Sequence, residues 1–305
     1  MNKNLLYALL IVIASSSYGI LSTIVKVAMQ HGFTSGEAVS SQYIIGFMLV
    51  LTIFIATQRQ LPKLSKKGLL ILVCAGIFTG TTGIVYGESL KYLPASLAVV
   101  MLFQFTWIGL LLDCALHKRL PSRAEVISLI VLFAGTILAA GVLNVDLSGI
   151  AIQGWLLGFT AAFTFACFIQ FNSRHVEGIT TTSRVLIVSF VALILICIFL
   201  NPEIIWNGKL FNEGLWKFGL ALGIFGIILP IYLFSIAIPK VGGALASILS
   251  AIELPVAVTV SVIVLHEPLT SLQIAGILLV IIGMMLPTIL AQRQQKKKSL
   301  EPVSK

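Results

Sequence analysis

Long apolar runs, separated by short polar connections, follow one another along the whole chain. Each run is about 20 residues long, the length at which an α-helix crosses the hydrocarbon core of a bilayer. The longest connections, 58–67 and 201–213, are too short to form domains of their own. The pattern predicts ten transmembrane helices, at residues 5–29, 37–57, 68–90, 94–116, 123–143, 151–172, 182–200, 214–237, 242–265 and 271–291.

The ninth apolar run contains an unusual pair of residues. Glu253 falls near the middle of the run, where a charged side chain costs about 2.5–3.5 kcal/mol on insertion scales. Pro255 has no N–H and its ring clashes with the carbonyl of Ala251, which predicts a kink in the helix. Such a pair is tolerated only where it faces protein or a water-filled cavity. The chain is therefore expected to be organised around a cavity that contains Glu253.

Composition supports a membrane protein. The chain is 58% hydrophobic and 10% charged, with a mean hydropathy of +1.05, whereas soluble domains carry about 25% charged residues. A large soluble domain is thus excluded, and the lipid bilayer is the expected surrounding. The four cysteines all lie in apolar runs without metal-ligand spacing, so neither disulfides nor a metal site nor another cofactor is expected.

The distribution of basic residues predicts the orientation. With the N-terminus placed inside, only Lys26, Lys91, Lys209 and Lys217 fall on the outer side, out of 20 Lys and Arg. This bias predicts that both termini are cytoplasmic. It also explains the net charge of +9 without nucleic acid as a partner. The expected location is the bacterial plasma membrane, with a basic cytoplasmic tail at residues 293–305.

The two halves of the chain match at an offset of 148 residues. Lys26 pairs with Arg174 and Gly135 pairs with Gly283, and the span boundaries also coincide. Each half, 1–146 and 147–292, has five predicted helices. Because five is odd, the halves must cross the membrane in opposite senses. The predicted fold is therefore an all-α membrane protein of two inverted five-helix repeats, an architecture of transporters with a midplane site.

The segment from Ala244 to Gly283 carries a resemblance to a known family. It contains Ser250-Ala-Ile-Glu-Leu-Pro-Val256, then Leu265-His-Glu-Pro268, then Gln273 and Gly276, and the first half holds a degenerate copy at Lys118-Arg-Leu-Pro121, Glu125 and Gly135. Over nearly its whole length the chain resembles the drug/metabolite transporter superfamily, specifically EamA-type members. The family places the acid directly before the proline, whereas Leu254 intervenes here. The resemblance implies a central cavity, peripheral fifth and tenth helices and a small-molecule substrate.

Polar and aromatic side chains are concentrated in six predicted helices, whereas the fifth and tenth are almost wholly aliphatic. We therefore expect the first, third, fourth, sixth, eighth and ninth helices to line the cavity. The fifth and tenth should face lipid or a partner.

The candidate substrate-binding residues are those expected near Glu253 at the midplane. Ser250 shares a helix face with Glu253. Trp107 is the repeat counterpart of Pro255, and Gln104 comes one residue before the counterpart of Glu253. For each hydroxyl a bond to its own helix is the alternative, and for each aromatic ring, core filling. The full set is Glu253, Ser250, Gln104, Trp107, Tyr86, Tyr18, Ser16, Trp155 and Tyr232.

Three interpretations of Glu253 remain open at this point. It exchanges protons, or it neutralises an amine-bearing substrate, or it bonds a neighbouring helix as a protonated structural acid. The leading functional hypothesis is a secondary transporter, an exporter of a small polar or amphipathic metabolite, coupled to protons through Glu253. No Walker-type glycine loop is present, so the energy must come from a gradient or from the substrate's own concentration.

Other functional classes receive less support from the sequence. A channel or uncoupled facilitator is the main alternative. The four histidines lie near span ends and form no metal-like set, so an enzyme is not expected. The substrate, the direction of transport and the choice between monomer and homodimer are not determined by these patterns.

Overall fold

The structure is a computed structural model and describes residues 3–58, 60, 62–89, 91–93, 95–141, 149–200, 202–266 and 269–300. All regular secondary structure in these ranges is helical. The elements are α1 (Lys3–Gln30), α2 (Ser35–Thr57), α3 (Lys66–Ser89), α4 (Ala95–Leu102), α5 (Phe105–Leu116), α6 (Arg123–Ala139), α7 (Ile152–Asn172), α8 (Thr181–Leu200), η2 (Glu203–Ile205), α9 (Leu215–Gly223), η3 (Ile224–Ile228), α10 (Leu229–Val241), α11 (Gly243–Leu249), η4 (Ser250–Ile252), α12 (Glu253–Leu265) and α13 (Ser271–Leu300).

The predicted all-helical membrane architecture is confirmed. Within the described ranges, eight helical runs are long and apolar enough to cross a membrane, and a shorter apolar helix covers Ser271–Pro287. Three of the eight runs are interrupted: α4 with α5, α9 with α10, and α11 with α12. The predicted repeat boundary at 146/147 and the motif residues Glu267 and Pro268 lie outside the described residues.

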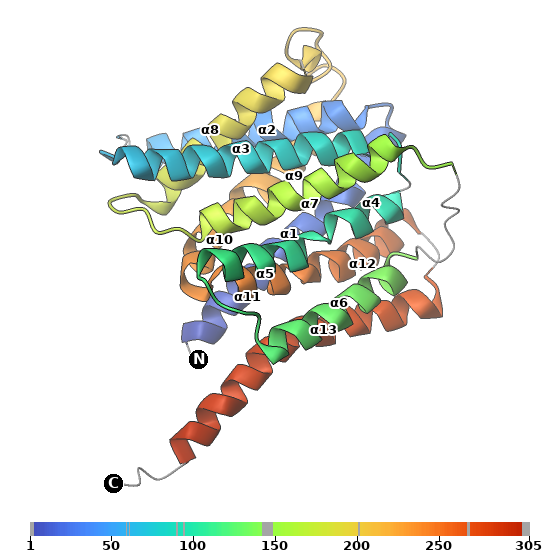
Figure 1. The fold of residues 1–305 in the computed structure, drawn as a ribbon. Coiled ribbons are helices and arrows are strands. Elements are labelled where there is room, and N and C mark those ends of the chain that lie inside the picture. Colours follow the sequence, from blue (N-terminus) through green and yellow to red (C-terminus); the bar gives the residue numbers. More distant parts are fainter. Residues whose placement is uncertain are drawn as a thin grey trace.

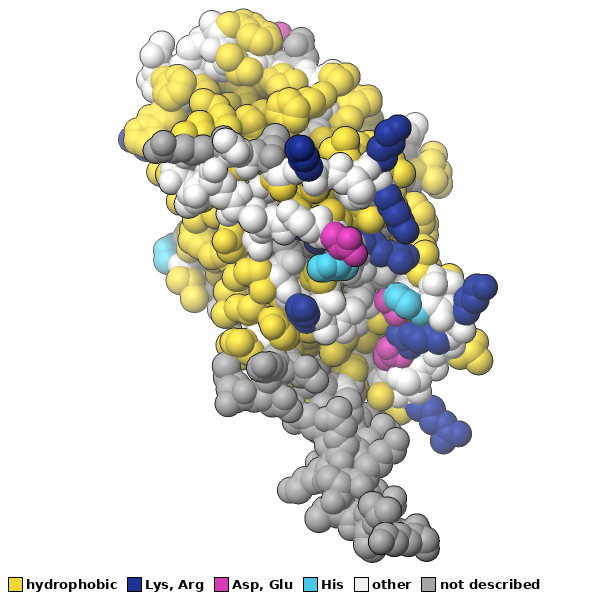
Figure 2. Space-filling model, turned by 90° about the vertical axis from the view of Figure 1, so that its left-hand side faces the viewer, with side chains coloured by type: hydrophobic (Ala, Val, Ile, Leu, Met, Phe, Trp, Pro, Cys, Tyr) yellow, Lys and Arg dark blue, Asp and Glu magenta, His cyan; other side chains and the backbone are white. Residues whose placement is uncertain are grey.

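The helices lie side by side, with their axes running across Figure 1. α1 begins and α13 ends at the same end of the bundle, and α13 continues beyond the predicted end at residue 291. Lys and Arg side chains gather on this end, which Figure 2 faces. We call it the basic end and the opposite one the distal end.

The two halves of the chain interdigitate. α2 packs against α9, while α3 packs against α7 and α8, so each contact joins one half to the other. Glycines permit the close approach that association in lipid requires. A Cβ atom on Gly46 would lie 2.7 Å from Ile227, and one on Gly76 would lie 2.6 Å from Val191.

α6 and α13 form a pair at the edge of the bundle (Figure 1). The Ser128 Oγ donates a 2.6 Å hydrogen bond to the Gly283 carbonyl. Gly135 and Gly276 also lie directly against the partner helix. Large apolar side chains such as Ile130 and Leu278 point outward and are exposed. These two elements match the predicted fifth and tenth helices, and they cover one another while their outer faces stay apolar.

The fourth and ninth predicted helices are broken at equivalent positions. A turn at Phe103 and Gln104 separates α4 from α5, and the 3₁₀ turn η4 separates α11 from α12. Pro255 is the third residue of α12, where its missing N–H would have no partner in that helix. The regular helix is therefore interrupted at η4 and resumes at Glu253, two residues before the proline.

Backbone conformation repeats at the same offset of 148 residues. Lys118 (φ 49°) and His266 (φ 55°) are the non-glycine residues with positive φ in the described chain, and they follow α5 and α12 respectively. α6 begins with a capping box in which Ser122 and Glu125 bond each other's backbone N–H, and Thr270 and Gln273 do the same at α13. The repeat is thus built into the local structure and does not rest on residue identities alone.

Candidate functional site

A cavity of about 710 Å³ lies between the two repeats. Its wall is formed by the last part of α1, the first part of α2, the last part of α3, by α4 and by α12. All these segments lie toward the distal end, because α1 and α3 finish there and α2 begins there. The cavity therefore extends from the middle of the bundle to the distal end.

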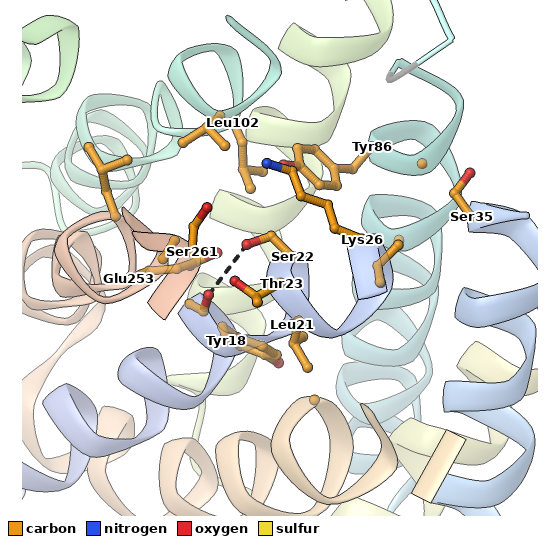
Figure 3. A pocket seen from close by; sticks show the side chains of 18 of the residues that line it. Tyr18, Leu21, Ser22, Thr23, Lys26, Ser35, Tyr86, Leu102, Glu253 and Ser261 are labelled. Atoms are coloured by element: carbon orange, nitrogen blue, oxygen red, sulfur yellow. Dashed lines mark hydrogen bonds between the residues drawn. The ribbon is translucent and has the colours of Figure 1, made fainter. Parts of the chain in front are cut away.

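Glu253 lies in the cavity wall at the first position of α12 (Figure 3). α1 approaches it closely, because a Cβ atom on Gly19 would lie 2.5 Å from the Glu253 carbonyl oxygen. The Glu253 Oε2 atom is buried and has no hydrogen-bond partner among the described residues. A buried carboxylate oxygen without a hydrogen-bond partner is stabilised by binding a proton or a cation.

Two further predicted residues, Tyr18 and Tyr86, line the same cavity from α1 and α3. The Tyr18 ring contacts Phe165 and Phe234, with centroid distances of 5.9 Å in both cases. The structure thus brings together Glu253, Tyr18 and Tyr86 out of the nine predicted residues.

Four predicted residues lie away from the cavity wall, in contacts between or within helices. Ser250 is buried and accepts a 3.0 Å hydrogen bond from Ser15 of α1. The Gln104 Oε1 accepts a 2.7 Å bond from the Trp107 Nε1, which fixes the turn between α4 and α5. Trp155 packs on the small cluster around Leu97.

The last two predicted residues, Ser16 and Tyr232, are also absent from the cavity wall. Ser16 is half-buried on α1, two residues before Tyr18 and hence on another face of that helix. Tyr232 is 37% exposed on α10. A substrate role for these six residues stays a prediction.

Sequence reasoning missed the contribution of α2. Gln42 and Tyr43 both line the cavity, although the second helix was not expected to do so. The Tyr43 hydroxyl donates to the Thr79 carbonyl at 3.1 Å, and the Gln42 side chain lies directly against Gly226. A buried glutamine and tyrosine one residue apart in an apolar run were the available signal. Ala139 of α6 and Gln273 of α13 also reach the wall, so the peripheral pair is not wholly excluded from it.

Lys26 adds a cation to the cavity wall. It follows Tyr18 and Ser22 at four-residue spacing, so the three side chains form a polar line along one face of α1. Its side chain crosses the cavity toward Tyr86 in Figure 3. Lys26 thus contributes to the cavity wall from the same helix as Tyr18.

An aromatic layer closes the cavity toward the basic end. Phe165 lines the cavity, and its ring meets Phe105 edge-on at 4.7 Å and Phe168 at 6.0 Å. Phe168 in turn contacts Phe234 at 6.4 Å. Phe105, Phe168 and Phe234 are fully buried. Packed aromatic rings thus lie behind the cavity wall at Phe165.

Comparison with known proteins identifies the family. The model of the EamA-like transporter family matches the chain twice, over residues 5–141 and 152–289. The chain belongs to the EamA-like transporter family. This confirms the resemblance inferred from the motifs and the organisation as a repeat. The EamA protein described here is accordingly a multi-pass membrane protein with a transporter fold.

Similarity to a solved structure supports the fold. One crystal structure, described only as that of a protein, has a TM-score of 0.74 and 15% sequence identity to this chain. The match covers 96% of this chain and 99% of the other. No curated protein matches the chain.

Proposed function

We propose that this EamA-family protein is a secondary active transporter that exports a small polar or amphipathic metabolite from bacterial cells. The observation that carries the proposal is the buried Oε2 of Glu253 in the cavity wall, which has no hydrogen-bond partner in the part of the chain that the structure describes. Because an isolated buried carboxylate is costly, the site takes up either a proton or the cationic group of a substrate. Competition between the two for one carboxylate couples their movements.

Exchange of a proton for a substrate at Glu253 favours export of the substrate. The proton gradient across a bacterial plasma membrane is directed inward. A proton that reaches Glu253 from outside displaces the substrate's amine there, and its release inside frees the carboxylate for the next substrate. One carboxylate thus serves both steps in turn.

The proposal includes an arrangement in the membrane. All ten helical units cross the bilayer, as repeats of residues 1–146 and 147–292, with residues 293–305 as a basic tail. The basic end faces the cytoplasm, since Lys and Arg gather on the cytoplasmic side of membrane proteins. Both termini are then cytoplasmic, and the cavity extends toward the outside.

Closure of the cavity at one end favours a carrier over a channel. The rings of Phe105 and Phe168 both contact the Phe165 ring, which lines the cavity. A carrier exposes its site to one side at a time, whereas a conducting channel is open to both. Flux that saturates with substrate concentration distinguishes the carrier.

Substitution of Glu253 by Gln tests the coupling. A thermal-shift screen against metabolite pools first identifies a stabilising compound, whose flux is then measured in proteoliposomes under an imposed pH gradient. We expect Glu253→Gln to lower flux about tenfold or more, since a hydrogen bond to a charged group contributes about 1.5–3 kcal/mol. The remaining flux should not respond to the pH gradient.

Glu88 supplies the matched control. Its carboxylate accepts a 2.7 Å hydrogen bond from Lys91 near the distal end and is partly exposed. Glu88→Gln therefore removes an acid of the same type at a position away from Glu253. This variant should keep both flux and pH dependence. Unchanged pH dependence in Glu253→Gln would remove the coupling role.

A further inference from the structure

The polar lining residues of the cavity are concentrated on one side. α1, α2 and α3 form this side and contribute hydroxyl, amide and ammonium groups to the wall. They include Tyr18 and Thr23 of α1, Gln42 of α2, and Thr82 and Tyr86 of α3. The first three helices of the chain therefore offer hydrogen-bonding groups to whatever the cavity holds.

The opposite side of the cavity is apolar. α4 contributes Val99 and Leu102 to the wall, and α6 contributes Ala139, the last residue of that helix. Neither α4 nor α6 places a polar side chain in the described part of the wall. In Figure 3, Leu102 lies across the cavity from Tyr18 and Thr23.

α12 connects the two sides. Its first residue, Glu253, supplies the carboxylate, and α1 rests on the backbone of that residue at Gly19. Val258 and Val262 follow as apolar lining residues, four positions apart and hence on one face of α12. Ser261 is the polar lining residue of α12 beyond the acid. The carboxylate therefore lies between the polar side chains of α1 and the apolar side chains of α12.

We propose that the transported compound is an amphipathic amine whose apolar segment lies against the apolar side of the cavity. We call this side the apolar wall; it consists of Val99, Leu102, Ala139, Val258 and Val262. The proposal rests on the transport function proposed above, in which the amine binds Glu253, and it narrows the substrate class. A wholly polar substrate would leave the apolar wall facing water, whereas an alkyl or aryl segment covers it and is itself removed from water.

The position of Lys26 agrees with this orientation. Lys26 comes seven residues after Gly19, so its Cα atom lies about 10 Å further along α1 than the contact with Glu253. Its side chain extends toward Tyr86 of α3 in Figure 3, on the polar side. The region around the carboxylate is thus left to a substrate cation. A volume of about 710 Å³ lies within the range of sites for drug-sized ligands, which gives room for an amine with a chain of several carbon atoms.

A series of n-alkylamines tests the apolar wall by binding alone. The compounds from butylamine to octylamine are protonated at neutral pH and differ only in chain length. Their affinities are measured by isothermal titration calorimetry on the full-length protein in lipid nanodiscs, with the heat from empty nanodiscs subtracted. We expect the affinity to rise about two- to fourfold for each added CH₂ group. An affinity that does not change with chain length overturns the proposal, including the case in which a lipid chain already covers the wall.

Two substitutions place a hydroxyl group in the apolar wall at nearly constant volume. They are Val99→Thr on α4 and Val258→Thr on α12. Each should weaken octylamine about threefold or more while butylamine binds as before, because only the longer chain reaches the altered surface. Gel filtration shows whether each variant folds, and the wild-type series decides the question even if neither does. Unchanged chain-length dependence in the folded variants overturns the placement of the apolar segment.

Val264→Thr supplies the matched control. Val264 belongs to the same helix as Val258 but is 50% exposed and absent from the cavity wall, so the same chemical change is made outside the cavity. This variant should bind the whole series as the wild type does. A loss equal to that of Val258→Thr would show that the chain binds outside the cavity, and it would overturn the proposal.

The corresponding n-alkanols separate this proposal from the proposed function. They carry the same chains without a charge. Alkanols that bind as tightly as the amines, with the same chain-length dependence, would leave the apolar wall as the binding surface and count against the role of Glu253. Alkylamines that bind with the expected chain-length dependence but are not transported in proteoliposomes would count against the transport function alone.

Discussion

Gly19 shows how a residue without a side chain positions the acid of the site. A Cβ atom at Gly19 would lie 2.5 Å from the Glu253 carbonyl oxygen and 3.0 Å from the Ala257 backbone nitrogen. Glycine therefore allows the backbone of α1 to rest on the first turn of α12. The distance between Tyr18 and Glu253 across the cavity depends on this contact.

Gly19→Leu should destabilise the protein and displace α12. Insertion of side-chain volume into a packed contact costs about 1–3 kcal/mol. We expect a lower midpoint of thermal unfolding in detergent and weaker ligand stabilisation. Gly36→Ala is the matched control, because no atom lies within 4 Å of a Cβ atom at that helical position. If both variants melt with the wild type, the contact is not as tight as described.

At the scale of elements, the broken helices determine what faces the cavity. η4 interrupts the ninth helix just before Glu253, so the acid occupies the first turn of α12 and not the interior of a continuous helix. Backbone N–H groups of a first turn lack partners within their own helix. The peripheral helices α6 and α13 have no such break, and their glycines hold the two helices close to each other.

Gly276→Val should separate α6 from α13. A Cβ atom at Gly276 would collide with the backbone nitrogen of Ala139. We expect a loss of about 1–3 kcal/mol in stability, measured by thermal or denaturant unfolding in detergent. Ile274→Ala lies on the exposed face of the same helix and should change stability much less. Equal effects of the two substitutions would show that the glycine contact contributes nothing particular.

At the scale of the whole molecule, the cavity makes the bundle asymmetric although its two halves are equivalent. The distal half is open between α4 and α12, whereas the basic half is closed between α5 and α11. Accessibility from the two sides of the membrane should therefore differ at related positions.

Single cysteines should report this asymmetry in intact cells. In a background lacking the native cysteines, Ser22→Cys in the cavity wall should react with a membrane-impermeant thiol reagent added outside. Ser247→Cys, buried against Gly109 in the basic half, should not react. Tyr92→Cys, exposed near the distal end, is the positive control. Leu120→Cys, exposed near the basic end, should react only after the cells are opened. Labelling of Leu120→Cys from outside would reverse the proposed orientation.

Much of the fold followed from the sequence, because its signals are long and local. Run lengths predicted the helices, the offset of 148 predicted the repeat, and the caps at Ser122 and Thr270 occupy equivalent positions in it. The candidate site was harder to predict. Gln42 and Tyr43 lie in an apolar run that contacts other helices on several sides, so hydrophobic periodicity did not indicate which side faces the cavity.

The sequence alone determined that this protein is a helical membrane protein of two repeats, with an acid near the middle of the ninth predicted helix. Run length, charge bias and internal repetition are properties of the chain itself. Only the tertiary structure decided that Glu253 shares a cavity with Tyr18, Tyr86 and Gln42, while Ser250 and Gln104 serve contacts within the bundle. The physical reason is that packing between helices decides which neighbour each face of an apolar helix contacts. The local order of residues does not contain this information.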